Sequence, residues 1–186
     1  MDSRREVVIT GIGVFSPVGI GVPQLIEHVR ENRSGIRVWE APEFGMRLPA
    51  GLIEQDFSGE FTKLELPYLD RCSQLAVLAA RQAAEDARIS CFDTYGRRAG
   101  LYFGSVGGGV KVEHDWVGDF HVQRKRTAKP YTIMACMLNS APAQISIRQQ
   151  ILGPVMTHSS ACTSSGAAIG DAYRAIRDGY LDVAVA

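Results

Sequence analysis

Cys162 is the residue of this sequence whose position best suits covalent chemistry. It stands in the segment 157–166 (THSSACTSSG), between a predicted strand over 155–159 and a predicted helix over 163–177. This order places Cys162 at the first turn of the helix, where unpaired N–H groups and the helix dipole favour a thiolate. The same N–H groups, that of Cys162 included, can stabilise an oxyanion. The pattern therefore predicts a nucleophilic cysteine; a small buried core residue is the alternative.

The remaining cysteines and the nearest histidine fit a catalytic role less well. No two cysteines have the C-x-x-C spacing of metal or redox sites. We expect Cys72 and Cys136, in apolar helical patterns, and Cys91, in a loop, to be structural, because no neighbouring residue would lower the pKa of their thiols. His158 precedes Cys162 by four positions, and four residues span about 13 Å along a strand. That separation exceeds the reach of a general base, so a His158–Cys162 pair is excluded unless the chain bends sharply.

Strands and helices alternate along the chain, which indicates a largely parallel sheet with helices on both faces. The predicted strands cover 6–10, 98–104, 155–159 and 181–186. A first predicted helix carries Leu25, Ile26 and Val29 on one face, and further helices are predicted over 70–88, 113–121, 132–150 and 163–177. Pro142 is expected to break the helix over 132–150, and Gly179 is the expected C-cap of the helix over 163–177. Residues 34–62 show no steady period and are treated as a long ordered excursion.

The composition fits one compact soluble domain. A chain of 186 residues that is 46% hydrophobic can bury one core. Twenty basic residues balance twenty acidic ones, which argues against nucleic acid as a partner. No apolar run is long enough for a membrane span and the N-terminus has no signal-peptide pattern, so we expect a cytoplasmic protein. The apolar strand at 181–186 predicts that the chain continues into a further element.

Two further motifs have competing interpretations. Gly11-Ile12-Gly13 after a strand is compatible with dinucleotide binding, but Ser16 stands where a third glycine is needed. The histidines and acids within 113–121 do not share one helical face, so a solvated surface is favoured over a metal site. The sequence therefore predicts neither a cofactor nor a metal.

Five segments, in order along the chain, resemble the elongating β-ketoacyl-(acyl-carrier-protein) synthases. They are 8–13 (VITGIG), 16–19 (SPVG), 104–105 (GS) with the glycines after it, 153–154 (GP) and 160–164 (SACTS). The resemblance implies a thiolase-like α/β fold and identifies residues 1–186 with the N-terminal β-ketoacyl synthase domain, the C-terminal half being absent. It also implies that Cys162 carries the acyl chain as a thioester for decarboxylative Claisen condensation with a malonyl-type thioester, in fatty-acid or polyketide biosynthesis.

The resemblance assigns roles to two further groups. Plausible contributors to an acyl pocket are Val110, Val112, Met134 and Met137. The resemblance implies that a basic segment docks the acidic acyl carrier protein; the alternative is an ordinary charged surface. This basic segment comprises Arg124, Lys125, Arg126 and Lys129.

The same resemblance leaves three matters open. The family's catalytic histidines have no counterpart in this sequence, so we expect that these 186 residues alone do not condense. A non-catalytic subunit resembling a chain-length factor, or a structural half-domain, is the competing interpretation, although such subunits usually lack the cysteine. A homodimer, or a heterodimer with a sister ketosynthase subunit, is expected around the strand before Cys162, where His158 replaces an apolar residue.

Overall fold

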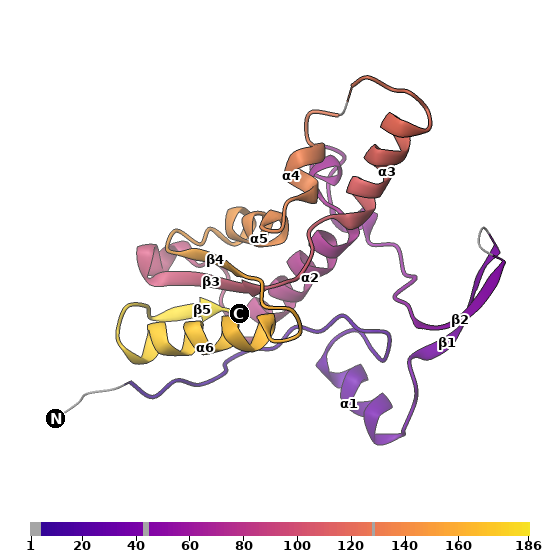
Figure 1. Cartoon of the computed structure of the whole chain (residues 1–186). Helices are drawn as coiled ribbons and strands as arrows, with labels where there is room; N and C mark the ends of the chain where they lie inside the picture. The colour runs from indigo at the N-terminus through magenta and orange to yellow at the C-terminus, as the bar shows by residue number, and fades with distance from the viewer. Residues whose placement is uncertain (1–4, 43–44, 128) are drawn as a thin grey trace.

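A three-stranded parallel sheet lies at the centre of the chain (Figure 1). The computed structural model describes residues 5–42, 45–127 and 129–186. Strands β3 (Ala99–Gly104), β4 (Val155–His158) and β5 (Val183–Val185) are ordered β4-β3-β5, with Leu101 paired to both Val155 and Val185. The predicted strands at 98–104, 155–159 and 181–186 are confirmed, with slightly shorter bounds.

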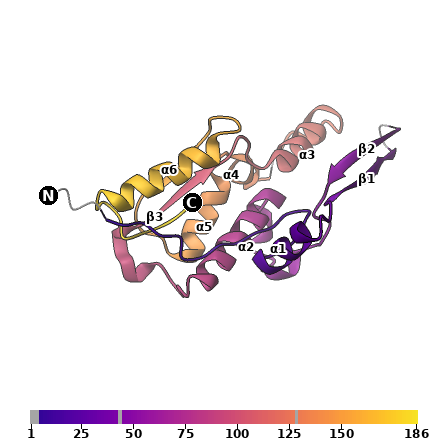
Figure 2. The same ribbon diagram turned by 90° about the horizontal axis from the view of Figure 1, so that it is seen from below.

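Helices cover both faces of this sheet, as predicted for an α/β fold. Helix α6 (Ser164–Arg177) packs on one face, and α5 (Ser140–Gln149), backed by α2 (Arg71–Asp86), packs on the other (Figures 1 and 2). Successive residues of a strand point to opposite faces. Leu101 therefore joins the α2–α5 cluster, whereas Tyr102 joins the α6 cluster.

Small side chains allow α2 and α5 to approach closely. Ser73 and Ser140 are both buried, and the Ser73 hydroxyl donates to Ser140 Oγ at 3.4 Å. The surrounding α2 residues include many alanines, which favour helix and leave room for a neighbouring helix. The predicted helix over 70–88 is confirmed.

The N-terminal segment differs from its prediction. Residues 6–10 form no strand, and the residues that follow, 11–14, lie against α2. The Ile12 N–H donates to Asp86 Oδ2 and the Val14 N–H to Gln82 Oε1, both at 3.0 Å. Side-chain acceptors of a helix thus take the hydrogen bonds that a neighbouring strand would supply.

The stretch 34–62 contains a hairpin that the sequence did not reveal. Strands β1 (Ile36–Ala41) and β2 (Met46–Gly51) pair antiparallel, from Ile36 opposite Gly51 to Ala41 opposite Met46. Both strands are largely exposed and extend away from the sheet (Figure 2). Hydrophobic alternation was weak because neither face of the hairpin is buried in a core.

The remaining elements connect these layers. They are α1 (Val22–Arg30), η2 (Ser58–Glu60), η3 (Leu66–Tyr68), η4 (Asp93–Arg98), α3 (Val110–His121) and α4 (Thr132–Cys136). The break predicted near Pro142 falls earlier, between α4 and α5. Pro142 itself lies in the first turn of α5, where a missing N–H costs no helical hydrogen bond.

Candidate active site

Cys162 lies at the tip of a tight turn between β4 and α6. The Ser105 N–H donates to His158 O at 3.0 Å, which fixes the end of β4 against β3. The chain then turns through Ala161, whose φ of +51° is in the left-handed region that costs an L-residue about 1–2 kcal/mol. Cys162 precedes the first residue of α6 by two positions, so it lies just before the helix and not in its first turn as predicted.

Hydroxyl groups hold this turn. Ser164, only 3% exposed, accepts from the Ser160 N–H at 2.9 Å and donates to Ala161 O at 2.7 Å. Thr163 Oγ1 donates to Ser160 O, also at 2.7 Å. The Cys162 side chain is exposed. The turn therefore presents the thiol at the surface, just before the first residue of α6.

A close backbone contact places β3 against the start of α6. A Cβ on Gly104 would lie 2.4 Å from Ser165 N, a distance that real side chains do not adopt. Only glycine permits this approach, so the residue type at Gly104 fixes the distance between the end of β3 and the turn that carries Cys162.

His158 is held away from Cys162. Its ring stacks on Tyr102 with centroids 6.2 Å apart, and its Nε2 lies 3.4 Å from Asp171 Oδ2. Burial raises the pKa of Tyr102, and the nearby Asp171 carboxylate raises it further. The chain does bend sharply between His158 and Cys162, yet the imidazole is directed toward α6, so the structure forms no His158–Cys162 pair.

The predicted acyl-contact residues come together on α3 and α4. Helix α3 begins against α4, because a Cβ on Gly109 would lie 2.2 Å from Ala135 O. Val110, Met134 and Met137 are 62%, 50% and 47% exposed, and Val112 is half-buried. Of these four, only Val112 lines the cavity of about 250 Å³ beside α3. The other three are exposed around the start of α3 and the end of α4.

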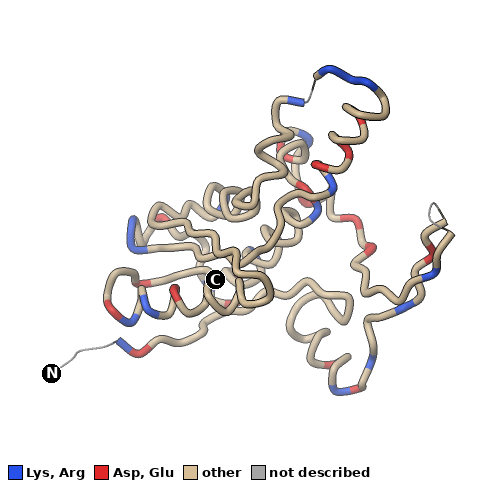
Figure 3. The backbone as a smooth tube through the Cα atoms, viewed as in Figure 1, with Lys and Arg blue, Asp and Glu red and all other residues tan. Residues whose placement is uncertain are grey.

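The basic segment follows α3 and is exposed throughout (Figure 3). Lys125 Nζ pairs with Asp119 Oδ1 at 2.9 Å, so one of its charges is partly neutralised within the chain. Arg124 has a φ of +57°, which marks the point where the chain turns after the helix.

The other cysteines differ from Cys162 in their contacts. Cys72 Sγ donates to Gly108 O, Cys91 Sγ to Gln150 Oε1 and Cys136 Sγ to Ile133 O. Desolvation raises the pKa of the Cys72 thiol and the neighbouring Asp70 raises it further, which disfavours the thiolate there.

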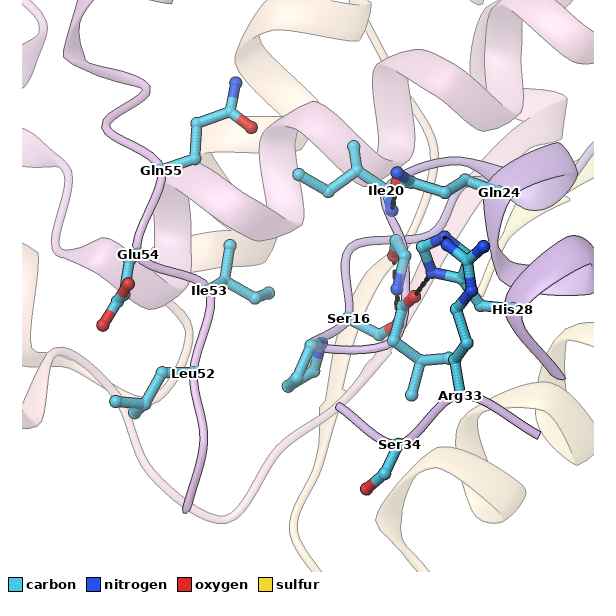
Figure 4. A pocket seen from close by; sticks show the side chains of 13 residues that line it. Ser16, Ile20, Gln24, His28, Arg33, Ser34, Leu52, Ile53, Glu54 and Gln55 are labelled. Atoms are coloured by element: carbon cyan, nitrogen blue, oxygen red, sulfur yellow. Dashed lines mark hydrogen bonds between the residues drawn. The ribbon is translucent and has the colours of Figure 1, made fainter. Parts of the chain in front are cut away.

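The larger cavity, about 310 Å³, lies elsewhere (Figure 4). It opens between residues 16–20, α1 and the segment 52–55, and contains no cysteine. His28 Nε2 accepts from Arg33 at 3.2 Å, so its Nδ1 carries the proton donated to Val18 O. The charged groups at its rim are already paired, Arg33 with Glu31 and Glu54 with Arg37.

The described residues contain neither a cluster of metal-ligating side chains nor a helix that could span a membrane. No group of three or more metal-ligating side chains occurs among residues 5–42, 45–127 and 129–186. No helix in those ranges has the length and hydrophobicity to cross a membrane.

Sequence reasoning treated the serines around Cys162 only as small side chains. Their hydroxyls in fact set the geometry of the turn, and Ser164 is the most buried of them. Serine and threonine clusters often bond local backbone groups, so the signal was present in the motif.

Comparison with known proteins places this fold and turn in one family. Residues 4–186 match the family model described as beta-ketoacyl synthase, N-terminal domain. The chain therefore belongs to the β-ketoacyl synthase family.

Individual relatives agree with this assignment. The chain is 28% identical to 3-oxoacyl-(acyl-carrier-protein) synthase 2 of Staphylococcus aureus (strain N315) over 100% of its own length and 45% of that protein. It is 33% identical to nodulation protein E of Rhizobium sp. (strain N33), over 98% of the chain and 46% of the relative. The chain thus spans about half the length of the relatives it matches.

Solved structures give the same fold. The ishigamide ketosynthase/chain length factor matches with a TM-score of 0.77 at 26% identity, over 97% of this chain and 46% of that one. A β-ketoacyl synthase from Burkholderia phymatum STM815 matches with a TM-score of 0.81 at 22% identity, over 94% of this chain and 44% of that one. The predicted thiolase-like fold is confirmed.

Proposed function

We propose that the protein carries the acyl intermediate of a ketosynthase on Cys162, within fatty-acid or polyketide synthesis. The observation that carries this proposal is the exposed Cys162 thiol on a turn that the buried Ser164 hydroxyl holds by two hydrogen bonds. Family membership supports the same reaction class.

The proposed step is a thioester exchange. The Cys162 thiolate attacks the carbonyl of an acyl thioester, and the resulting oxyanion accepts a hydrogen bond from the Cys162 N–H. The carbon–sulfur bond to the carrier then breaks, and the carrier leaves as a thiolate that takes a proton from solvent. The products are an acyl-Cys162 thioester and a free carrier thiol.

Condensation requires further groups. Decarboxylation of a malonyl-type thioester needs proton-handling and anion-stabilising side chains near the acyl sulfur. His158, the histidine nearest in sequence, is stacked on Tyr102. We therefore propose that these 186 residues, as the N-terminal β-ketoacyl synthase domain, form the thioester but do not condense it.

The proposed partners follow from exposed surfaces. The basic segment is proposed to attract an acidic acyl carrier protein by its charge. Strand β4 is an edge strand with exposed Val155 and Met156, which supports its proposed role in a homodimer or a heterodimer with a sister ketosynthase subunit. A cytoplasmic location stays a prediction.

A non-catalytic role is the second candidate. One structural neighbour is a ketosynthase/chain length factor, and no histidine among the described residues pairs with Cys162. If the protein serves such a role, Cys162 reacts with acyl thioesters no faster than the other cysteines do.

Acyl transfer distinguishes the two candidates. The protein is incubated with an acyl-pantetheine thioester, digested and mapped by mass spectrometry. The proposal predicts an adduct on Cys162 that is lost in Cys162→Ala and retained in Cys91→Ala. An unmodified Cys162 under conditions that acylate another cysteine supports the non-catalytic role.

A further inference from the structure

Asp70 is a buried carboxylate that joins the starts of two helices. Asp70 is 6% exposed and directly precedes α2. One oxygen, Oδ1, accepts from the Cys72 N–H of α2 at 3.1 Å. The other, Oδ2, accepts from the Val112 N–H of α3, also at 3.1 Å. Each oxygen thus satisfies an N–H group that its helix leaves unpaired.

Helix α3 has no side-chain cap of its own. Its N-cap is Gly109, and Asp70 supplies the missing acceptor from a distant part of the sequence. The two backbones are in close contact, because a Cβ on Gly109 would lie 2.8 Å from Asp70 Cβ. Cys72 Sγ adds a bond to Gly108 O at 3.4 Å. The start of α3 is therefore fixed on the start of α2.

The position of α3 decides where two of the proposed acyl contacts lie. Val110 and Val112 stand in its first turn, and the start of α3 lies against the end of α4, because a Cβ on Gly108 would lie 2.5 Å from Met137 O. We propose that Asp70 is a positioning residue for the acyl chain, and that it sets which chain length Cys162 accepts best. This inference rests on the proposed function, since Asp70 itself touches no reacting atom.

Capping of α2 alone does not require a carboxylate. Asparagine and serine cap helices about as well as aspartate. Only a carboxylate, however, offers acceptor oxygens to both N–H groups at once. Asp70→Asn keeps an acceptor for Cys72 and turns an NH₂ group toward the Val112 N–H. Asp70→Ser keeps a short acceptor for Cys72 and does not reach Val112. Both variants release α3 while retaining the cap of α2.

The experiment compares acyl chains of different length. Initial rates of Cys162 acylation are measured with acetyl-pantetheine and dodecanoyl-pantetheine, and amide hydrogen exchange is followed at Val112. Losing one hydrogen bond to a charged group raises KM for the dodecanoyl thioester about tenfold, with the acetyl thioester changed less than about twofold. Exchange at Val112 accelerates in both Asp70 variants. Thermal melts show whether each variant folds. If Asp70→Asn does not fold, the comparison of acyl lengths is made with Asp70→Ser.

Asp56→Asn is the matched control. Asp56 Oδ1 accepts from the Ser58 N–H at 2.8 Å in an exposed loop, so its substitution should leave both acyl lengths unchanged. An equal loss for both thioesters in the Asp70 variants, or unchanged exchange at Val112, overturns the inference. Wild-type protein that forms no Cys162 adduct refutes the proposed function, whereas a wild-type adduct with an unaltered length profile in the variants refutes only the role of Asp70.

Discussion

Ser164 provides the sharpest test of how the turn serves Cys162. Substitution by alanine removes one hydroxyl and with it two hydrogen bonds, one from the Ser160 N–H and one to Ala161 O. Each bond contributes about 0.5–1.5 kcal/mol, so the turn loses about 2 kcal/mol. Fewer contacts then hold Ala161 in its left-handed conformation, and the turn can relax away from it.

The expected consequences are separable. A loss of about 2 kcal/mol lowers Tm by about 4–8 °C in a chain of this size. We also expect the rate of Cys162 acylation to fall about tenfold, because a relaxed turn presents the thiol and its N–H less often in the reactive geometry. Acylation is measured by intact-mass spectrometry under single-turnover conditions, and Tm by circular dichroism.

Ser146→Ala is the matched control for this prediction. The Ser146 hydroxyl donates to Ile151 O at 3.0 Å, at the far end of α5. This variant should lower Tm by about 2–4 °C without changing the acylation rate. If Ser164→Ala loses stability but acylates Cys162 as fast as wild type, the hydroxyl lock has no part in presenting the thiol and the reasoning is refuted.

Three further predictions address other parts of the molecule. Gly104→Ala should lower Tm by more than Ser164→Ala and reduce acylation, because its Cβ would meet Ser165 N; an unchanged melt contradicts this close contact. Asp182 is held by hydrogen bonds from Arg98 and Arg5, which keep the pKa of its carboxyl well below its usual range. Its stabilising contribution is present above the unfolded pKa of about 4 and is lost as pH falls, so Asp182→Asn should lower Tm at neutral pH but not in strong acid; an equal difference in melts at both pH values would falsify this linkage. Replacing the basic segment with glutamates should raise KM for an acyl carrier protein substrate in a salt-dependent way and leave KM for acyl-pantetheine unchanged; a parallel change in both argues against docking there.

The sequence predicted the elements that have a buried face. The alternation of strands and helices around the sheet, and the strand–turn–helix around Cys162, follow from local patterns that tertiary packing reinforces. The predicted strand at 6–10 was wrong: these residues pair with no strand, and the residues that follow bond to side chains of α2, Asp86 and Gln82. The hairpin β1–β2 was missed because its exposed strands lack alternation.

The long-range contacts of the site could not be read from spacing. Asp70 is the first residue of the helix predicted over 70–88, but its capping bonds were not predicted, and its bond to Val112 depends on how α2 and α3 meet. His158 lies close to Cys162 in sequence, yet its ring is fixed by Tyr102 and Asp171 from β3 and α6. Val112 and Tyr102 come from elements distant in the sequence, and only the packed structure brings them to Asp70 and His158.

We propose that the turn between β4 and α6 gives Cys162 a reactivity that the other cysteines lack. The most direct measurement follows acylation of all four cysteines in one sample as the concentration of a long-chain acyl thioester is raised. We expect Cys162 to be modified first and with saturation, as for a bound substrate, while the exposed Cys72 reacts slowly and in proportion to concentration. Equal, unsaturable rates at Cys162 and Cys72 would contradict it.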